Sequence, residues 1–276
     1  MAIRRVVNLT LLYALLILIG AFFVLPLLWM ISTSLKDETG VFTDPGLIPR
    51  NPTVANFQHL LSAGGDTPVF RWLLNSAIVS IAGTALTVLL TSLSAYAFAR
   101  MEFPGKSAIF GLMIATLLLP SVMFLVPQFV LVNDLGIFNT YPAFILPGLG
   151  GVFGVFFMRQ FFMGIPNEME EAAFIDGAGR LRIFWTIVLP LSGPAIATLS
   201  VISFLAYWND YLWPLIVCQG AGCTLPPGLR NLQGEFVTQY GLIMAGAVLS
   251  SIPVLAFYIL VQRWIIQSVV SAGIKG

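Results

Sequence analysis

Long apolar runs dominate the sequence, and their lengths predict six membrane-spanning helices. The runs cover residues 9–31, 72–99, 107–126, 141–158, 191–217 and 241–261. A helix of roughly 20 residues crosses the hydrocarbon layer of a bilayer, and backbone amides in lipid must be paired within the segment. The runs do not alternate as the strands of a membrane barrel do. The pattern therefore predicts an all-α integral membrane protein.

Charged residues are too sparse for a soluble fold of this length. Hydrophobic residues make up 58% of the 276 residues and charged residues 9%, whereas soluble domains have roughly 45–50% and about 25%. Most of the surface must therefore face lipid. The net charge of +1 argues against a nucleic-acid partner, which would require a concentrated basic face.

The distribution of lysine and arginine predicts the orientation, because cytoplasmic loops carry the excess. Nine basic residues fall on the side of the two chain ends and four on the other, which predicts that both termini are cytoplasmic. The first run is longer than the 7–15-residue core of a signal peptide, so we interpret it as a span. The nine are Arg4, Arg5, Arg100, Lys106, Arg159, Arg180, Arg182, Arg263 and Lys275; the four are Lys36, Arg50, Arg71 and Arg230.

One acidic stretch, NEMEEAAFIDGAGRLRIFW at 167–185, lies between the fourth and fifth runs on the cytoplasmic side. Asn167 and Glu170 have the spacing of a capping box, which predicts a helix start. Gly177 and Gly179 permit a sharp bend, and a second short helix is expected at 180–188. One helix face would be small enough for another surface to approach closely; it consists of Met169, Ala172, Ala173 and Asp176.

The order of residues in this stretch resembles the EAA motif of the transmembrane subunits of bacterial ABC importers. A plain acidic loop, the alternative, requires no fixed order. The matching positions are Glu171, Ala172, Ala173, Asp176, Gly177, Ala178, Phe184, Ile187, Pro190 and Pro194, with Glu170 directly before them. Such a match, in the expected loop, is specific for a short motif.

The resemblance covers nearly the whole chain. The segments AYAFARMEFPGK at 95–106, VPQFVLVNDLGIFNTYPAFILP at 126–147, YWNDYLWPLIV at 207–217, TLPPGLRNLQGEF at 224–236 and the closing AGIKG are similar to carbohydrate permeases of the maltose type. The chain is most similar to the shorter, six-span member of the permease pair. The resemblance implies one permease domain of the type I importer fold over 1–276, with a cytoplasmic coupling loop at about 159–190.

The resemblance also implies a complex in the bacterial inner membrane. Its expected partners are a sister permease, two ATPase subunits that use ATP and Mg²⁺, and an extracytoplasmic solute-binding protein; no cofactor is expected on this chain. The EAA helix would dock on the ATPase, with Glu171 pairing with a basic group there. The expected cargo is a di- or oligosaccharide such as maltose or trehalose, with glycerol 3-phosphate or another polyol as the alternative.

Enzymatic and ion-driven functions find less support in the sequence. FPGKS at 103–107 ends like a phosphate-binding loop, but the required first glycine is replaced by Arg100. No hydrolase motif is present, and His59, the only histidine, has no neighbour at metal-ligand spacing. An ion-coupled carrier normally needs carboxylates inside the spans, and the runs offer only Asp210.

The fifth run carries the candidate translocation residues Tyr207, Asn209, Asp210 and Trp213. Aromatic rings can stack on sugars and acid or amide groups can bind hydroxyls. The alternative, favoured for most of the aromatic residues here including Trp208, is a belt at the membrane interface. Asp210 could equally be a surface carboxylate at the outer end of the span.

Prolines and glycines predict irregular backbone in the third and fourth runs. Pro120 and Pro127 lie near the end of the third, and Gly150 and Gly154 of the fourth form a G-x-x-x-G pair that favours close helix packing. Cys218 and Cys223, the only cysteines, lie in an outer loop; a disulfide and free thiols are both left open.

Overall fold

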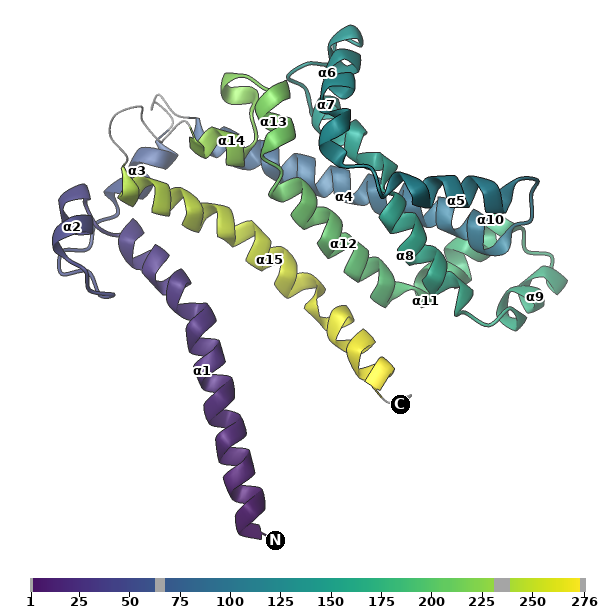
Figure 1. Cartoon of the computed structure of the whole chain (residues 1–276), viewed down its shortest axis with the longest axis horizontal. Coiled ribbons are helices and arrows are strands. Elements are labelled where there is room, and N and C mark those ends of the chain that lie inside the picture. The colour runs from purple at the N-terminus through teal and green to yellow at the C-terminus, as the bar shows by residue number, and fades with distance from the viewer. Residues whose placement is uncertain (1, 63–67, 231–238, 274–276) are drawn as a thin grey trace. The chain divides into compact units, whose positions relative to one another are not determined.

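The computed structural model describes residues 2–62, 68–230 and 239–273, and within these ranges the regular structure is entirely helical (Figure 1). Three helices are each long and apolar enough to cross a membrane: α1 (Ala2–Ser34), α4 (Val69–Arg100) and α15 (Tyr240–Gly273). Three further pairs of helices pass the same test but are bent, which gives six spans if each pair is one span. The predicted all-α membrane class is confirmed.

The third predicted span is not one continuous helix. The chain runs from α5 (Lys106–Thr116) into η1 (Ser121–Phe124) and α6 (Leu125–Asp134), with a bend of 97° between the two parts. Pro120 has extended backbone angles and precedes η1 directly, and the residue before a proline is disfavoured in helical conformation. The irregular backbone predicted near Pro120 is therefore confirmed, whereas the predicted end of the run at residue 126 is wrong, because the helix α6 continues to Asp134.

The fourth span has the irregular backbone that its prolines and glycines predicted. It consists of α7 (Tyr141–Ile145), η2 (Leu146–Gly150) and α8 (Val152–Met163), with a bend of 50°. A Cβ on Gly154 would lie 3.0 Å from Thr91 and 3.2 Å from Leu199, so this glycine permits close packing of α8. Gly150 has nothing within 4 Å of its Cβ position, so the predicted G-x-x-x-G pair is used at one end only.

The fifth predicted span, 191–217, is interrupted. A helical segment made of α10 (Arg180–Ile183), the π-helical η3 (Phe184–Val188) and α11 (Leu189–Leu191) is bent by 82° against α12 (Gly193–Trp208). A second helix, α13 (Leu212–Val217), begins after a break at residues 209–211. The prediction of one continuous helix is wrong, and the break falls at Asn209 and Asp210.

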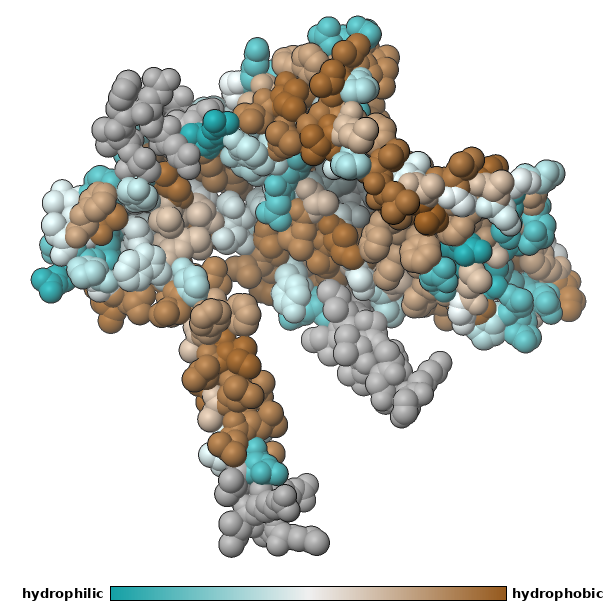
Figure 2. Space-filling view, in the orientation of Figure 1, coloured by the Kyte–Doolittle hydropathy of each residue, from teal (hydrophilic) through white to brown (hydrophobic). Residues whose placement is uncertain are grey.

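The chain divides into two compact units. The first consists of Met1–Phe70 and Gly228–Ile252. It contains α1, whose most apolar window has no buried residue and whose middle part is brown in Figure 2. It also contains the short helices α2 (Glu38–Thr43) and α3 (Ala55–Leu61). Lys36 is buried and donates to the carbonyls of Asp44 and Gly46 at 2.6 and 2.7 Å. The backbone N–H of Arg50 lowers the pKa of the Asp44 carboxyl.

The second unit, Arg71–Pro227 and Pro253–Gly276, contains the candidate site. Its apolar core includes the aromatic rings of Tyr96, Phe162 and Phe184, the last a residue of the predicted motif. The Tyr96 and Phe184 ring centroids lie 5.3 Å apart. This core packs α4, α8 and the segment from α10 to α11 together. A single domain over 1–276 stays a prediction.

An outer loop of the second unit is closed by a disulfide between Cys218 and Cys223, which settles the alternative left open by the sequence. The loop contains η4 (Gly220–Gly222) and precedes α14 (Leu225–Arg230). The carbonyl of Gly220 accepts from the Trp72 indole, and the carbonyl of Cys223 accepts from the Asn75 amide at 2.8 Å. The loop is thus bound to the start of α4.

Candidate functional site

The acidic stretch forms α9 (Glu168–Ile175), which ends in a tight turn before α10. Three glutamates lie in its first turn, where the helix dipole favours anions. The N–H of Gly177 donates to the Phe174 carbonyl and that of Ala178 to the Ala173 carbonyl, a C-cap that requires left-handed backbone between them. Gly177 supplies it with φ of 79°, whereas Gly179 has ordinary extended angles. The predicted short helix, bend and second helix are confirmed; we call α9, this turn and α10 the elbow.

The predicted capping box is wrong. Asn167 has helical backbone angles and its side chain does not cap α9; it accepts a hydrogen bond from Arg100 instead. Glu170 turns inward and forms an ion pair with Arg100, with Nε and Oε1 2.7 Å apart. The side chains of Arg100 and Glu170 are only 11% and 7% exposed. Glu170 therefore anchors α9 to the end of α4.

Arg100 is the centre of a wider polar cluster. Its guanidinium also donates to the carbonyl of Phe162 at 2.8 Å, at the end of α8. The Tyr96 hydroxyl donates to the other oxygen of Glu170 at 3.1 Å, and Arg180 of α10 donates to the Arg100 carbonyl at 3.2 Å. The ends of α4 and α8 and both arms of the elbow are thus joined. Sequence reasoning missed Arg100 and Tyr96 as site residues and treated Arg100 only as a topology signal.

The remaining motif residues divide between the core and the surface. Ala173 and Ala178 are half-buried and pack against the core. The predicted docking role of the helix face that contains Ala173 stays a prediction. Glu171, Ala172, Asp176 and Pro190 are exposed. Large apolar side chains are exposed beside them, most of all Ile175 at 87% and Leu181 at 68%. Exposed apolar side chains gathered among polar ones are typical of a protein interface, and Figure 2 shows hydrophilic residues around this end of the second unit.

Arg159 lies within α8 and not in the coupling loop, whose predicted boundary at about 159 is therefore too early. Its guanidinium carbon lies 4.4 Å from the centroid of the Phe110 ring, and its Nε donates to the Phe98 carbonyl at 3.1 Å. The connection between helices begins at Gly164.

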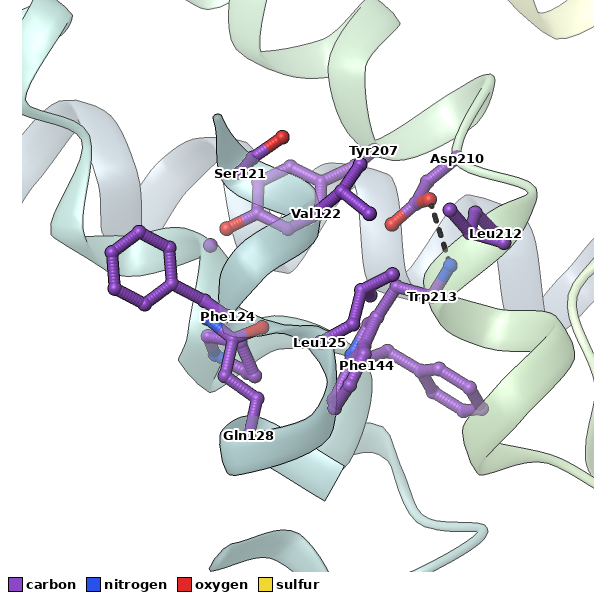
Figure 3. Close-up of a pocket in the computed structure, with 12 residues that line it drawn as sticks. Ser121, Val122, Phe124, Leu125, Gln128, Phe144, Tyr207, Asp210, Leu212 and Trp213 are labelled. Atoms are coloured by element: carbon purple, nitrogen blue, oxygen red, sulfur yellow. Dashed lines mark hydrogen bonds between the residues drawn. The ribbon is translucent and has the colours of Figure 1, made fainter. Parts of the chain in front are cut away.

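A cavity of about 300 Å³ lies beside the break in the fifth span. Three of the predicted pathway residues, Tyr207, Asp210 and Trp213, line it; Asn209 is exposed at the end of α12 and does not. Ser121 and Gln128 contribute from η1 and α6 on the opposite wall (Figure 3). The other lining residues are Val122, Phe124, Leu125, Phe144, Pro147, Gly148 and Leu212. The cavity combines an apolar wall with a few polar groups, as ligand sites usually do.

The break positions Asp210 at the start of α13, where one carboxylate oxygen accepts the N–H of Trp213 at 3.4 Å. The Trp213 indole donates to the Ala143 carbonyl at 2.8 Å, so the indole N–H is hydrogen-bonded within the protein. Trp208 is 2% exposed and stacks on Phe204. The predicted interface belt is therefore wrong for both tryptophans, whereas Tyr211 is exposed.

Tyr207 passes between two glycines. A Cβ on Gly148 would lie 2.6 Å from its hydroxyl oxygen, and one on Gly83 would lie 2.7 Å from its ring. The hydroxyl lies 3.1 Å from the Thr87 hydroxyl. Both glycines were missed by sequence reasoning, since the need for them appears only when three segments meet.

In the part of the chain that the structure describes, no group of three or more His, Cys, Asp or Glu side chains is placed to hold a metal ion. The candidate site consists instead of the elbow and a lined cavity in one unit.

Residues 87–271 match a model of the family described as binding-protein-dependent transport system inner membrane component. The chain belongs to this family. It is 34% identical over 257 residues to the arabinooligosaccharides transport system permease protein AraQ of Halalkalibacterium halodurans, covering 92% of this chain and 91% of AraQ. It is 36% identical over 264 residues to the sn-glycerol-3-phosphate transport system permease protein UgpE of Yersinia pestis, covering 93% and 94%.

The fold is similar to a solved chain of a bacterial ABC transporter involved in the import of the acidic polysaccharide alginate. The TM-score is 0.80 at 22% identity, with 94% of this chain and 96% of that chain covered. The predicted importer permease fold is confirmed, and the chain is a multi-pass inner membrane permease.

Proposed function

We propose that this chain forms half of the translocation pathway of an ATP-driven importer for a di- or oligosaccharide. Its elbow receives movement from a separate ATPase and passes it to the spans. The observation that carries this proposal is the buried ion pair between Glu170 of α9 and Arg100 of α4, 2.7 Å apart. This pair joins an exposed acidic helix directly to a membrane-spanning one.

The ion pair makes the elbow and the end of α4 move as one body. Separating the two charges would leave each desolvated and unpaired, which costs about 3–5 kcal/mol. A partner that displaces α9 would therefore move α4 and α8 with it, because moving them costs less than separating Glu170 from Arg100. Glu171, which is exposed on the same helix, is available to pair with a basic group of the ATPase.

The cavity supports a carbohydrate cargo. Its apolar and aromatic wall suits the faces of sugar rings, and the hydroxyl, amide and carboxylate groups of Ser121, Gln128 and Asp210 suit sugar hydroxyls. AraQ is a relative whose name gives an oligosaccharide cargo. In the proposed assembly, a sister permease supplies the other half of the pathway.

The proposed assembly has a sister permease, two ATPase subunits that bind ATP and Mg²⁺, and an extracytoplasmic solute-binding protein. The family description, which names dependence on a binding protein, supports the last. ATP hydrolysis resides in the partners, so this chain is a transport subunit and not an enzyme. Glycerol 3-phosphate or another polyol is the second candidate cargo, because UgpE is 36% identical.

Reconstitution tests the proposed function. The chain, its sister permease and the ATPase subunits are placed in liposomes, with the binding protein and a panel of labelled sugars outside. Uptake is expected only with ATP and Mg²⁺ on the ATPase side and with the binding protein present. Uptake driven by a proton or sodium gradient without the ATPase would overturn the proposal and favour an ion-coupled carrier.

A further inference from the structure

Asp210 lies where two cavities meet. It lines the cavity of about 300 Å³ already described and a second of about 260 Å³ toward α4 and α8, and Tyr207 and Gly148 line both. The second cavity is otherwise lined by Thr87, Gly151, Phe153, Gly154, Leu199, Ile202, Ser203 and Ala206. None of the described residues that line either cavity is a lysine, arginine or histidine. Asp210 is the one charged group among them.

The Asp210 carboxylate has no cation to balance it. Its hydrogen bond is to the N–H of Trp213, at 3.4 Å. The ion pairs found among the described residues lie elsewhere, at Arg50–Asp44, Arg100–Glu170 and Lys106–Glu102. Figure 3 shows the side chain between Tyr207 and Leu212, within the ring of lining residues. Its negative charge is therefore available to act on whatever enters.

An uncompensated carboxylate in a poorly solvated cavity discriminates by charge. Coulomb energy at a few ångströms is several times larger there than in water, and a second anion beside it is strongly disfavoured. A neutral sugar, in contrast, donates its hydroxyl hydrogens to the carboxylate, which accepts only. Rejection of one class of cargo by an unpaired charge is a common source of specificity.

We propose that Asp210 makes this cavity a charge filter, which admits neutral, hydroxyl-rich carbohydrates and rejects anionic cargo such as sugar phosphates and uronates. The proposal rests on the proposed function and deepens it, because it decides between its two candidate cargo classes. The identity of the relatives does not decide this, since the names of AraQ and UgpE give a neutral and a phosphorylated cargo.

The electrical field of the cavity can be measured without knowing the cargo. Both native cysteines are paired in the disulfide, so Ser121→Cys introduces the one free thiol of this chain, on a lining residue that is exposed. In the assembled membrane complex, its reaction rates with a trimethylammonium and a sulfonate methanethiosulfonate are measured. Each rate is divided by that of the same reagent with a small free thiol.

The cationic reagent is expected to react at least about tenfold faster than the anionic one, a local enrichment in the range of charge-lined clefts. Adding Asp210→Asn should bring the ratio close to one. Asp134→Asn, the same change at an exposed residue of α6 outside both cavities, should leave the ratio unchanged. A ratio near one in the parent, or one that survives Asp210→Asn, would overturn the charge filter.

A second arm measures cargo class directly. Liposomes containing the complex are given maltotriose or sn-glycerol 3-phosphate with the cognate binding protein. Uptake of glycerol 3-phosphate at or above the neutral rate would overturn the charge filter while the ATP-driven importer still stood. Failure of ATP-dependent uptake would instead count against the proposed function, and the thiol rates would still decide the filter.

Discussion

Two acidic side chains of the same unit, Glu170 and Asp210, have opposite environments. Glu170 forms an ion pair with Arg100 at 2.7 Å and accepts a hydrogen bond from the Tyr96 hydroxyl, so its charge is balanced inside the protein. Asp210 has one hydrogen bond of 3.4 Å to a backbone N–H and faces a cavity. A paired buried acid fixes the position of a helix, whereas an unpaired one is free to act on a ligand. In the proposed function, the paired acid fits the elbow's role of transmitting movement and the unpaired acid fits the cavity's role of selecting cargo.

The largest effect is expected when the anchored acid is removed. Glu170→Ala leaves the Arg100 guanidinium buried and unpaired, and we expect a loss of about 3–5 kcal/mol in the free energy of unfolding. Uptake should be abolished. The midpoint of thermal unfolding of the purified complex and uptake in liposomes measure the two effects.

Tyr96→Phe is the matched control for this change, because it removes only the hydroxyl that donates to Glu170. It should cost about 1 kcal/mol and retain part of the uptake. If Glu170→Ala were no more destabilising than Tyr96→Phe, the Arg100–Glu170 ion pair would not be the contact that holds α9 to α4.

A smaller effect is expected from the turn of the elbow. Gly177→Val forces a β-branched residue to φ of 79°, which costs about 1–3 kcal/mol. No atom lies within 4 Å of the Cβ position, so the strain is in the backbone alone. The angle between α9 and α10 should change, and the solute imported per ATP hydrolysed should fall while ATP hydrolysis persists.

Gly179→Val tests the same elbow two residues further on. Gly179 has φ of −73° and ψ of 160° and open space at its Cβ position, so valine should fit there and transport should stay near the parent level. Equal transport by Gly177→Val and Gly179→Val would show that the left-handed backbone at Gly177 is not needed for transport.

The cavity should respond to a single methyl group. Gly148→Ala places a Cβ 2.6 Å from the Tyr207 hydroxyl oxygen, and overpacking of this kind costs about 1–3 kcal/mol. Tyr207 should be displaced and the KM for uptake should rise, with coupling to ATP retained. Gly150→Ala, with nothing within 4 Å, is the control, and an equal rise in KM in both variants would contradict the packing account.

The smallest effect is expected at an exposed ion pair near the elbow. Lys106 lies 3.0 Å from Glu102, whose side chain is 91% exposed. Surface pairs contribute about 0–1 kcal/mol, so Glu102→Gln should shift the unfolding midpoint little, and less still in high salt. A loss as large as that of Glu170→Ala would show that burial does not distinguish the two pairs.

Local chemistry made the elbow predictable from the sequence. Its glycine and its acidic first turn act on their immediate neighbours, so residue types and spacing suffice. The partnership of Arg100 and Glu170 was not predictable in this way, because it depends on how α4 and α8 pack. The spacing of Asn167 and Glu170 even suggested a capping box that the ion pair replaces.

Hydrophobic length predicted where the spans lie but not where they break. The run at 107–126 has no charged residue and the run at 191–217 has only Asp210. Mean hydropathy over such a run does not reveal a 97° bend at Pro120 or the end of α12 at Trp208. The break at residues 209–211 lies beside the cavity, and three of the four predicted pathway residues, Tyr207, Asp210 and Trp213, line it. The aromatic side chains looked equally suited to an interface belt, and only their burial distinguishes the two roles.

Crosslinking at the tip of the elbow tests the central claim most directly. Ile175→Cys, at the end of α9 and 87% exposed, provides the one free thiol of this chain in the assembled complex. We predict that a short maleimide–succinimidyl ester reagent will link this thiol to a lysine of the ATPase subunit, and that a membrane-impermeant thiol reagent added outside will not reach it. Labelling from the outside, or a thiol that links to no ATPase subunit, would contradict the account.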